Sequence, residues 1–123
     1  MRPTVIALAI AALGMPSAAL AQDAARGKEL FVQCVACHSL EAGRNELGPS
    51  LHRLFGRKTA SVDDYIYSPP MRRANAVWTP ELLDTFLADP QSLPFRGNKM
   101  PFAGVPDPKA RADIIAYLKE ATQ

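Results

Sequence analysis

Two cysteines and a histidine lie within five residues of one another, in the stretch Cys34-Val-Ala-Cys37-His38. They are the only cysteines of the chain, and the one other histidine is His52. Cys-x-x-Cys-His is the signature of covalent haem attachment. On a helix the two cysteines would lie about 4.5 Å apart along the axis. Both thiols could then form thioethers with the vinyl groups on one porphyrin edge, and His38 could place a ring nitrogen on the iron.

Three other uses of these residues compete with haem attachment. A disulfide between Cys34 and Cys37 would close a very small loop, which removes little entropy from the unfolded chain. A thiol–disulfide oxidoreductase carries its Cys-x-x-Cys motif in a βαβ context, which this sequence lacks. A zinc site could draw on Cys34, Cys37, His38 and His52, but the histidines are spaced too widely for a finger-like site.

A second iron ligand would have to come from elsewhere in the chain. Met100 lies in the stretch Arg96-Gly-Asn-Lys-Met-Pro-Phe-Ala-Gly104, whose glycines and proline predict a loop. Such a loop could cross the haem face opposite His38. We interpret Met71, beside two arginines, as core filling, and His52 remains an alternative that would give a bis-histidine site.

Ligation by histidine and methionine points to electron transfer. A thioether is a soft ligand that raises the reduction potential of haem iron. Two axial ligands also leave no position for oxygen or peroxide, so the iron changes charge without binding a substrate, and the sequence predicts a carrier that is not an enzyme. The alternatives are a haem enzyme or gas sensor with a labile distal Met100, and a haem subunit bound permanently to one enzyme.

Helix signals occur in three parts of the sequence. Gly27, Leu30, Phe31 and Cys34 have the i, i+3, i+4, i+7 spacing of one helical face. This spacing predicts a helix that leads into the Cys-x-x-Cys-His motif.

The other two predicted helices begin with a capping residue followed by proline. One begins at Thr79-Pro80-Glu81 and ends at Asp89-Pro90, because a residue before proline avoids helical angles. The other begins at Asp107-Pro108 and continues with helical spacing to Ala121. Between the helices lie long segments marked by Gly48-Pro49, Pro69-Pro70, Pro94 and Pro101, and Tyr65 to Tyr67 could be extended but has no evident partner strand. We therefore predict an all-α fold in which helices and long loops surround one large prosthetic group, which would give such loops an organising core.

The first 21 residues have the pattern of a cleaved secretory signal peptide. Arg2 precedes nine apolar residues from Val5 to Leu13, and Ala19-Leu-Ala21 provides a small-x-small cleavage site. We expect cleavage after Ala21, which leaves one domain over residues 22–123 in the periplasm. Without Arg2 the domain has 13 basic and 12 acidic side chains, a formal charge of +1. This balance argues against nucleic-acid binding, which requires a concentrated basic face.

The chain resembles class I cytochrome c, specifically the bacterial relatives of the mitochondrial protein. The resemblance extends from about Gly27 to Ala121. It is carried by Gly27-Lys-Glu-Leu-Phe31, Cys34-Val-Ala-Cys-His38, Gly48-Pro-Ser-Leu-His-Arg-Leu-Phe-Gly-Arg57, Trp78, Lys99-Met-Pro-Phe-Ala-Gly104 and Ile115-Ala-Tyr-Leu118.

The resemblance implies one covalently bound haem c and a role for each matching residue. Cys34 and Cys37 would form the thioethers, and His38 and Met100 would be the axial ligands. The Pro49 carbonyl would accept the second ring N–H of His38. The remaining implied roles are propionate contacts or screening by Arg57, Tyr67 and Trp78, shielding of the haem edge by Phe102, and a close crossing of the first and last helices at Gly27, with Phe31 and Tyr117 packed against each other.

The sequence departs from the family pattern near Met100. Phe86 stands where many members have a tyrosine whose hydroxyl reaches the methionine sulfur, and Arg96 stands where proline is common. Lys99 could replace Met100 as a ligand at high pH.

The family also implies transient redox partners for a monomeric carrier. These would be a membrane quinol–cytochrome c reductase as electron donor and a cytochrome oxidase or another periplasmic redox protein as acceptor. Members commonly present lysines around the haem edge. This chain has few lysines, and its basic side chains near the edge would be Lys28, Lys58, Lys99, Arg44, Arg72, Arg73 and Arg96.

Overall fold

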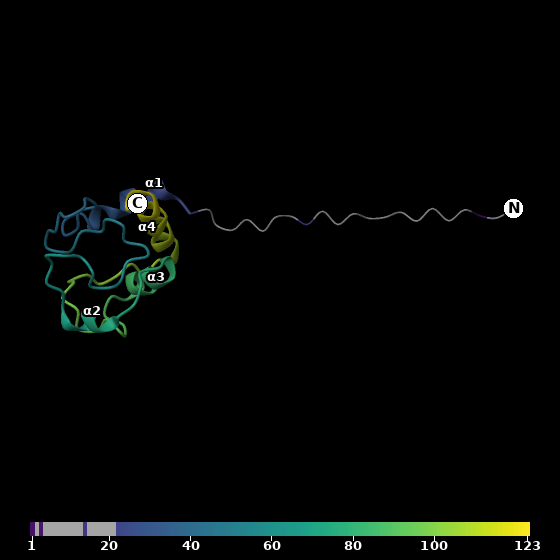
Figure 1. Ribbon diagram of the computed structural model, residues 1–123. Helices are drawn as coiled ribbons and strands as arrows, with labels where there is room; N and C mark the ends of the chain where they lie inside the picture. Colours follow the sequence, from purple (N-terminus) through teal and green to yellow (C-terminus); the bar gives the residue numbers. More distant parts are fainter. Residues whose placement is uncertain (2, 4–13, 15–21) are drawn as a thin grey trace.

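A computed structural model describes residues 1, 3, 14 and 22–123 of the chain (Figure 1). The predicted signal peptide and its cleavage site after Ala21 lie outside the described residues, apart from the three isolated positions. The helices follow in the order α1 (Ala24–Leu30), η1 (Phe31–Gln33, a 3₁₀ helix), α2 (Pro69–Ala74), α3 (Pro80–Ala88) and α4 (Pro108–Ala121). Within residues 22–123 the only β-type pairing is an isolated antiparallel bridge between Lys58 and Val77. The predicted all-α fold is therefore confirmed.

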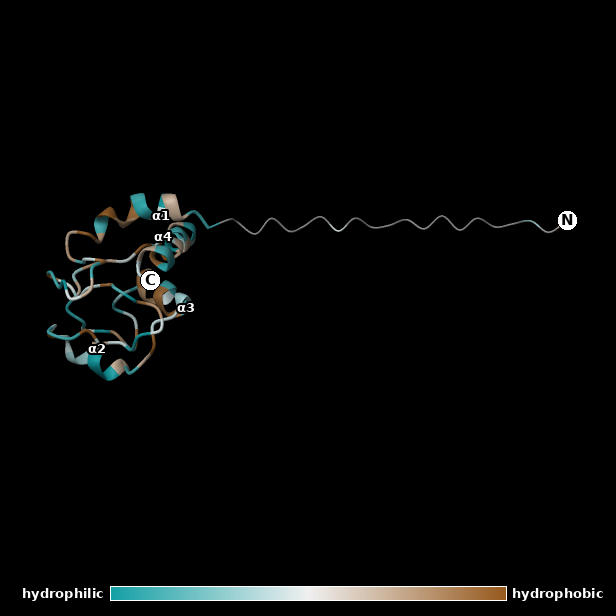
Figure 2. Cartoon of the chain, turned by 45° about the horizontal axis from the view of Figure 1, so that its top comes forward, coloured by the Kyte–Doolittle hydropathy of each residue, from teal (hydrophilic) through white to brown (hydrophobic). Residues whose placement is uncertain are grey.

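α1 and α4 pack together at one end of the molecule, and α2 lies at the other. Both views show this arrangement, with α3 beside α4 (Figures 1 and 2). Long loops connect the two ends. None of the helices in the described part of the chain has the length and apolar character needed to cross a membrane.

The crossing of α1 and α4 depends on Gly27. A Cβ atom at this position would lie 1.9 Å from the carbonyl oxygen of Asp113 and 2.9 Å from the Cβ of Tyr117. The two backbones can come this close because glycine has no side chain. Beside the crossing, the rings of Phe31 and Tyr117 lie 5.4 Å apart at a tilt of 57°. The predicted close crossing with these two aromatic residues is present.

The predicted boundaries of α3 and α4 are confirmed, and their caps explain them. The Thr79 side chain accepts a hydrogen bond from the amide of Leu82, and the Asp107 side chain accepts one from the amide of Lys109. A proline follows each cap at the first helical position, where its missing N–H costs nothing. α3 ends at Ala88, and the extended φ of −152° at the following Asp89 suits the residue before Pro90.

The first helix ends earlier than predicted. Regular α-helix ends at Leu30, and Cys34 is the residue that follows the short 3₁₀ helix η1. The cysteines therefore lie in turns and not on an α-helix. The amides of Cys37 and His38 both donate to the carbonyl of Cys34, at 3.1 and 3.0 Å. These turn bonds preserve the one-turn spacing of the two thiols without a continuous helix.

The prediction of an irregular segment at Pro69-Pro70 was wrong, because these residues begin α2. They occupy the first positions of this six-residue helix, which ends at Ala74 and is followed by Asn75 with a left-handed φ of +45°. A helix this short is not stable alone. Pro70 is buried, and a Cβ on Gly97 would lie 3.6 Å from its ring, so α2 lies beside the loop of Met100 in the folded chain.

The hydrophobic core combines side chains of the helices with aromatic residues of the loops. Trp78 stacks on Phe95 with ring centroids 5.6 Å apart, and Phe86 meets both rings edge-on. Arg111 of α4 forms an ion pair of 2.7 Å with Asp84 of α3. The buried hydrophobic residues are Phe31, Leu54, Trp78, Leu83, Phe86, Leu87, Phe95, Val105, Ile114, Ile115 and Leu118.

Candidate functional site

A cavity of about 450 Å³ opens at the centre of the fold, between the helices and the long loops. This volume is typical of a site for a cofactor or small molecule. Its wall is mostly apolar, with Leu51, Leu54 and Leu83 among the lining residues. All nine predicted site residues line it: Cys34, Cys37, His38, Pro49, Arg57, Tyr67, Trp78, Met100 and Phe102.

The two cysteines are partly buried, free thiols in the cavity wall. Burial raises the pKa of Cys34 to about 11, with a smaller contribution from Cys37. A redox-active or nucleophilic cysteine has the opposite property, a lowered pKa close to a helix N-terminus or a cation. Cys34 instead follows the end of η1. This environment argues against the thiol–disulfide oxidoreductase alternative.

His38 is held by the loop that follows it. Its Nδ1–H donates to the carbonyl oxygen of Pro49 at 2.7 Å, the contact that the family resemblance implied. Burial lowers the pKa of His38, and Arg57 lowers it further, although the bond to Pro49 opposes both effects. The ring is therefore neutral at pH 7, and its proton lies on Nδ1. Nε2 keeps its lone pair, as a metal ligand must.

Gly48 allows the His38 ring to lie against the backbone. A Cβ at this position would come within 2.5 Å of the ring carbon Cε1 and within 2.9 Å of both ring nitrogens. The amide of Gly48 also donates to the carbonyl of Cys37 at 2.7 Å. The Gly48-Pro49 pair thus fixes the orientation of the imidazole from two sides.

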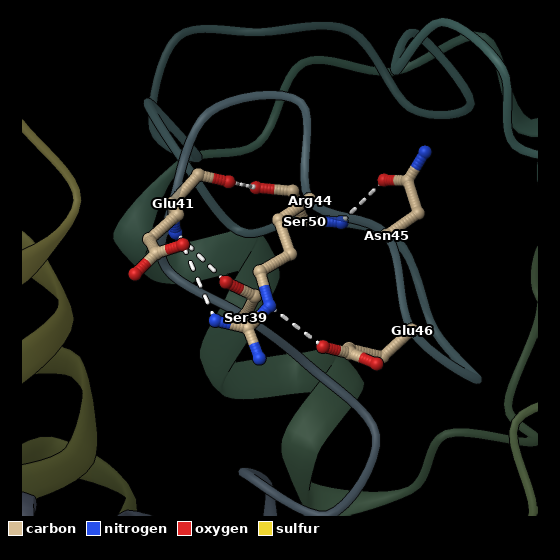
Figure 3. Close-up of polar contacts among 6 residues, drawn as sticks. All are labelled: Ser39, Glu41, Arg44, Asn45, Glu46 and Ser50. Atoms are coloured by element: carbon tan, nitrogen blue, oxygen red, sulfur yellow. Dashed lines mark hydrogen bonds and ion pairs between the residues drawn. The ribbon is translucent and has the colours of Figure 1, made fainter.

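The loop over residues 39–50 is fixed by its own polar contacts (Figure 3). The buried Ser50 hydroxyl donates to the carbonyl of Glu41 at 2.5 Å, and the amide of Ser50 donates to the side chain of Asn45 at 2.9 Å. Arg44 bridges Glu41 and Glu46 at the surface, where such ion pairs contribute little. The sequence reasoning missed Ser50 and Asn45. Their polar types beside Gly48-Pro49 were the only signal available.

Met100 also lines the cavity, and it lies in the loop between α3 and α4. Its amide donates to the side-chain oxygen of Asn98 at 2.8 Å. The neighbouring Lys99 is directed away from Met100, since its Nζ donates to the carbonyl of Ile66 and lies 4.6 Å from the centre of the Tyr65 ring. Asn98 also lines the cavity, and the sequence reasoning missed it.

Arg57 and Trp78 are neighbours because two short segments pair. The amide of Trp78 donates to the carbonyl of Arg57, and the amide of Gly56 donates to the carbonyl of Trp78, both at 2.9 Å. The Arg57 side chain donates to the carbonyl of His52 at 2.8 Å. Burial lowers the pKa of Arg57, and no carboxylate among the described residues forms an ion pair with it.

Tyr67 brings a second polar group to the cavity. Its hydroxyl oxygen accepts a hydrogen bond from the amide of Val62 at 3.2 Å, which leaves the hydroxyl proton free to donate. Burial raises the pKa of Tyr67, so the hydroxyl stays protonated. An acidic ligand entering this cavity would meet both a cation and a hydroxyl donor.

The remaining residues named from the sequence are also accounted for. Phe86 and Met71 line the cavity. Because phenylalanine has no hydroxyl, Phe86 cannot donate a hydrogen bond to a methionine sulfur. His52 is not part of the cavity wall, which argues against a bis-histidine site. Residues 22–123 also contain no group of three or more His, Cys, Asp or Glu side chains that could hold a metal ion, so the zinc alternative lacks a ligand set.

The donor set fits haem c. Two adjacent thiols, a neutral imidazole and a thioether line one apolar cavity, and a partly buried arginine offers a partner for carboxylates. A buried cation without a counter-charge is costly, so propionates would complete the environment of Arg57.

Comparison with known proteins decides the family. The sequence model of the cytochrome c family matches residues 24–122. The chain belongs to the cytochrome c family. It is 40% identical to cytochrome c2 of Blastochloris viridis over 121 residues, which cover 98% of this chain and 94% of the relative. It is 43% identical to cytochrome c2 of Rhodopila globiformis over 79% of this chain and 92% of the relative. It is also 42% identical to cytochrome c of Arabidopsis thaliana, over 82% and 91% respectively.

Membership of this family establishes the cofactor and the general function. The protein is a class I cytochrome c that carries covalently attached haem c with its iron, and it is an electron-carrier cytochrome.

Proposed function

We propose that this cytochrome is a periplasmic one-electron carrier whose haem iron is ligated by His38 and Met100. It takes electrons from a membrane quinol–cytochrome c reductase and passes them to a cytochrome oxidase or another periplasmic redox protein. It catalyses no bond-making step, so it is not an enzyme. The signal peptide over residues 1–21 directs it to the periplasm.

One observation supports this proposal most strongly. A neutral histidine with a free Nε2 and a methionine thioether line the same cavity, and they come from segments 62 residues apart in sequence. Cys34 and Cys37 lie in the wall beside His38. This is the donor set of a histidine–methionine cytochrome.

The chain itself would bind and orient the haem and exclude water from it. When bound, haem iron supplies a centre that changes by one electron between the ferrous and ferric states. Cys34 and Cys37 would hold the haem covalently, and Pro49 keeps His38 in the tautomer that can ligate. Arg57, Tyr67 and Trp78 accommodate the propionates. Phe102 and the apolar wall would shield the haem from water.

The surface near Met100 favours acidic partners. The segments 65–80 and 90–106 contain Arg72, Arg73, Arg96 and Lys99, all exposed, and no acidic residue. They adjoin each other, since Gly97 lies against Pro70 of α2. Complementary charge speeds the formation of transient complexes and loses its effect as salt rises. We therefore propose that the carrier is a monomer that docks through this basic region.

Absorption spectra of the purified protein test the ligation. We expect a weak far-red sulfur-to-iron band in the oxidised form and no reaction of the reduced form with carbon monoxide. Ready binding of carbon monoxide would favour the alternative, a haem enzyme or gas sensor with a labile Met100. Residues 22–123 plus one haem should account for the intact mass of the mature protein, and a retained N-terminal segment would contradict cleavage after Ala21.

A further inference from the structure

The loop that carries Met100 has no helix or strand to fix it between Asp89 and Val105. Its amide groups are held by turns and by one buried side chain, Asn98, which is 8% exposed. An axial ligand on an irregular loop needs such support, because a free loop would sample many positions.

The Asn98 side chain uses all of its hydrogen-bonding groups within this loop. Its Nδ2 donates to the carbonyls of Pro90 at 2.6 Å and Phe95 at 3.1 Å. Its Oδ1 accepts from the amide of Met100 at 2.8 Å. One amide therefore ties the beginning, the middle and the ligand position of the loop together.

The two carbonyls that Asn98 binds belong to well-anchored residues. Phe95 is 1% exposed and packs in the aromatic group with Trp78 and Phe86, and Pro90 is also fully buried. Gln91 adds an outer contact, since its side chain bonds to the carbonyl of Asn98 and to the amide of Gly97. The position of the Met100 backbone is thus tied, through Asn98, to fully buried residues of the core.

We propose that Asn98 is the positioning residue for the sixth iron ligand: its side chain locks Met100 against the cavity and keeps the thioether from detaching. This inference rests on the proposed ligation by Met100. Asn98 touches no iron in this scheme and acts through the backbone of Met100.

The hydrogen-bond pattern requires an asparagine. Aspartate would keep the acceptor for the Met100 amide but would place a second oxygen against the carbonyls of Pro90 and Phe95. Alanine would leave the Met100 amide and the Pro90 carbonyl without a partner, whereas the Phe95 carbonyl would keep its bond from the backbone amide of residue 98 at 3.0 Å. Buried groups without partners are costly. Both changes therefore favour an arrangement in which the loop opens.

Competition with imidazole measures how often Met100 detaches in the oxidised protein. Imidazole binds only when the position is vacant, so its apparent affinity scales with the open fraction. We expect Asn98→Ala to raise that affinity about tenfold, which corresponds to about 1.4 kcal/mol, the size of one lost buried hydrogen bond. Asn98→Asp should raise it as well, and both variants should weaken the far-red band.

Asn45→Ala is the matched control. The side chain of Asn45 also bonds to two backbone groups, since it accepts from the amide of Ser50 and donates to the carbonyl of Asp63. Asn45 lies in the loop that follows His38. We expect this variant to lose stability while its imidazole affinity stays at the wild-type value. Equal affinities in Asn98→Ala and Asn45→Ala would overturn the positioning role, because general loosening would then explain the result.

Hydrogen exchange provides a measurement that does not depend on the iron or on a variant that folds poorly. In the wild-type protein the Met100 amide should exchange slowly, although it lies in a loop, because its partner is the buried Asn98 side chain. Exchange at the rate of an unstructured peptide would overturn the proposal. A wild-type protein without the far-red band would refute ligation by Met100, and this proposal with it. A band that is present and unchanged in Asn98→Ala would refute the role of Asn98 alone.

Discussion

Replacing Gly27 with alanine would make the new methyl group clash with the backbone of α4. The added Cβ would lie 1.9 Å from the Asp113 carbonyl oxygen, whereas real Cβ atoms stay at least 3.0 Å from such an atom, so the helices must separate by about 1.1 Å. A carbonyl within a helix cannot rotate away. The separation would loosen the Phe31–Tyr117 contact and the packing around it.

The expected cost is about 2 kcal/mol of unfolding free energy. Overpacking costs about 3 kcal/mol at the upper end of its usual range, and the better helix propensity of alanine returns about 1 kcal/mol. In a domain of this size that loss lowers the melting temperature by about 8–16 °C. Urea and thermal unfolding of the haem-loaded protein, followed by circular dichroism, would measure both quantities.

Ala25→Gly is the control for helix propensity. Ala25 is exposed on the same helix, so this change should cost only about 1 kcal/mol. A Gly27→Ala protein that unfolds at or above the wild-type midpoint would refute the argument, because the two backbones would then have room that the structure does not show.

Three further predictions concern the iron ligands and the buried carboxylate of α4. Met100→Ala should abolish the far-red band and allow the reduced protein to bind carbon monoxide; an unchanged spectrum would exclude Met100 as a ligand. Gly48→Ala should displace the His38 ring, since its Cβ would meet Cε1 at 2.5 Å, and should lower the yield of haem-loaded protein in a host that attaches haem; a normal yield and spectrum would contradict this clash. The Lys109 ammonium group holds the pKa of Asp113 below its usual 3.8, so its stabilisation is present above that pH and is lost as the pH falls through the lower, folded-state pKa. The stability difference between wild type and Asp113→Asn, measured by urea unfolding, should therefore shrink in acid, and a difference independent of pH would argue against the ion pair.

The sequence alone determined the features that depend on a few neighbouring residues. The Cys34–His38 motif specified the cofactor because thiol spacing and an adjacent imidazole are local properties. The caps at Thr79 and Asp107 specified where two helices begin, because capping groups bond to amides two or three residues away. The fold class followed from these helices and from the absence of alternating strand patterns.

Tertiary structure decided the features that depend on distant partners. α2 is too short to be stable alone, and its buried Pro70 lies beside the loop of Gly97 only in the folded chain. The first helix ends at Leu30, and turns carry the cysteines, although the apolar spacing continues to Cys34. Periodicity reports which face is buried and does not report where the backbone bends.

The supports of the proposed iron ligands were decided in the same way. In the sequence Asn98 is one polar residue of a loop, and only the folded structure shows that its side chain bonds to the carbonyls of Pro90 and Phe95. Ser50 likewise gained its role when the loop brought the carbonyl of Glu41 to its hydroxyl. Which atoms bond to a side-chain amide or hydroxyl depends on the folded path of the chain, whereas the chemistry of a thiol, an imidazole or a thioether can be read directly from the residue type.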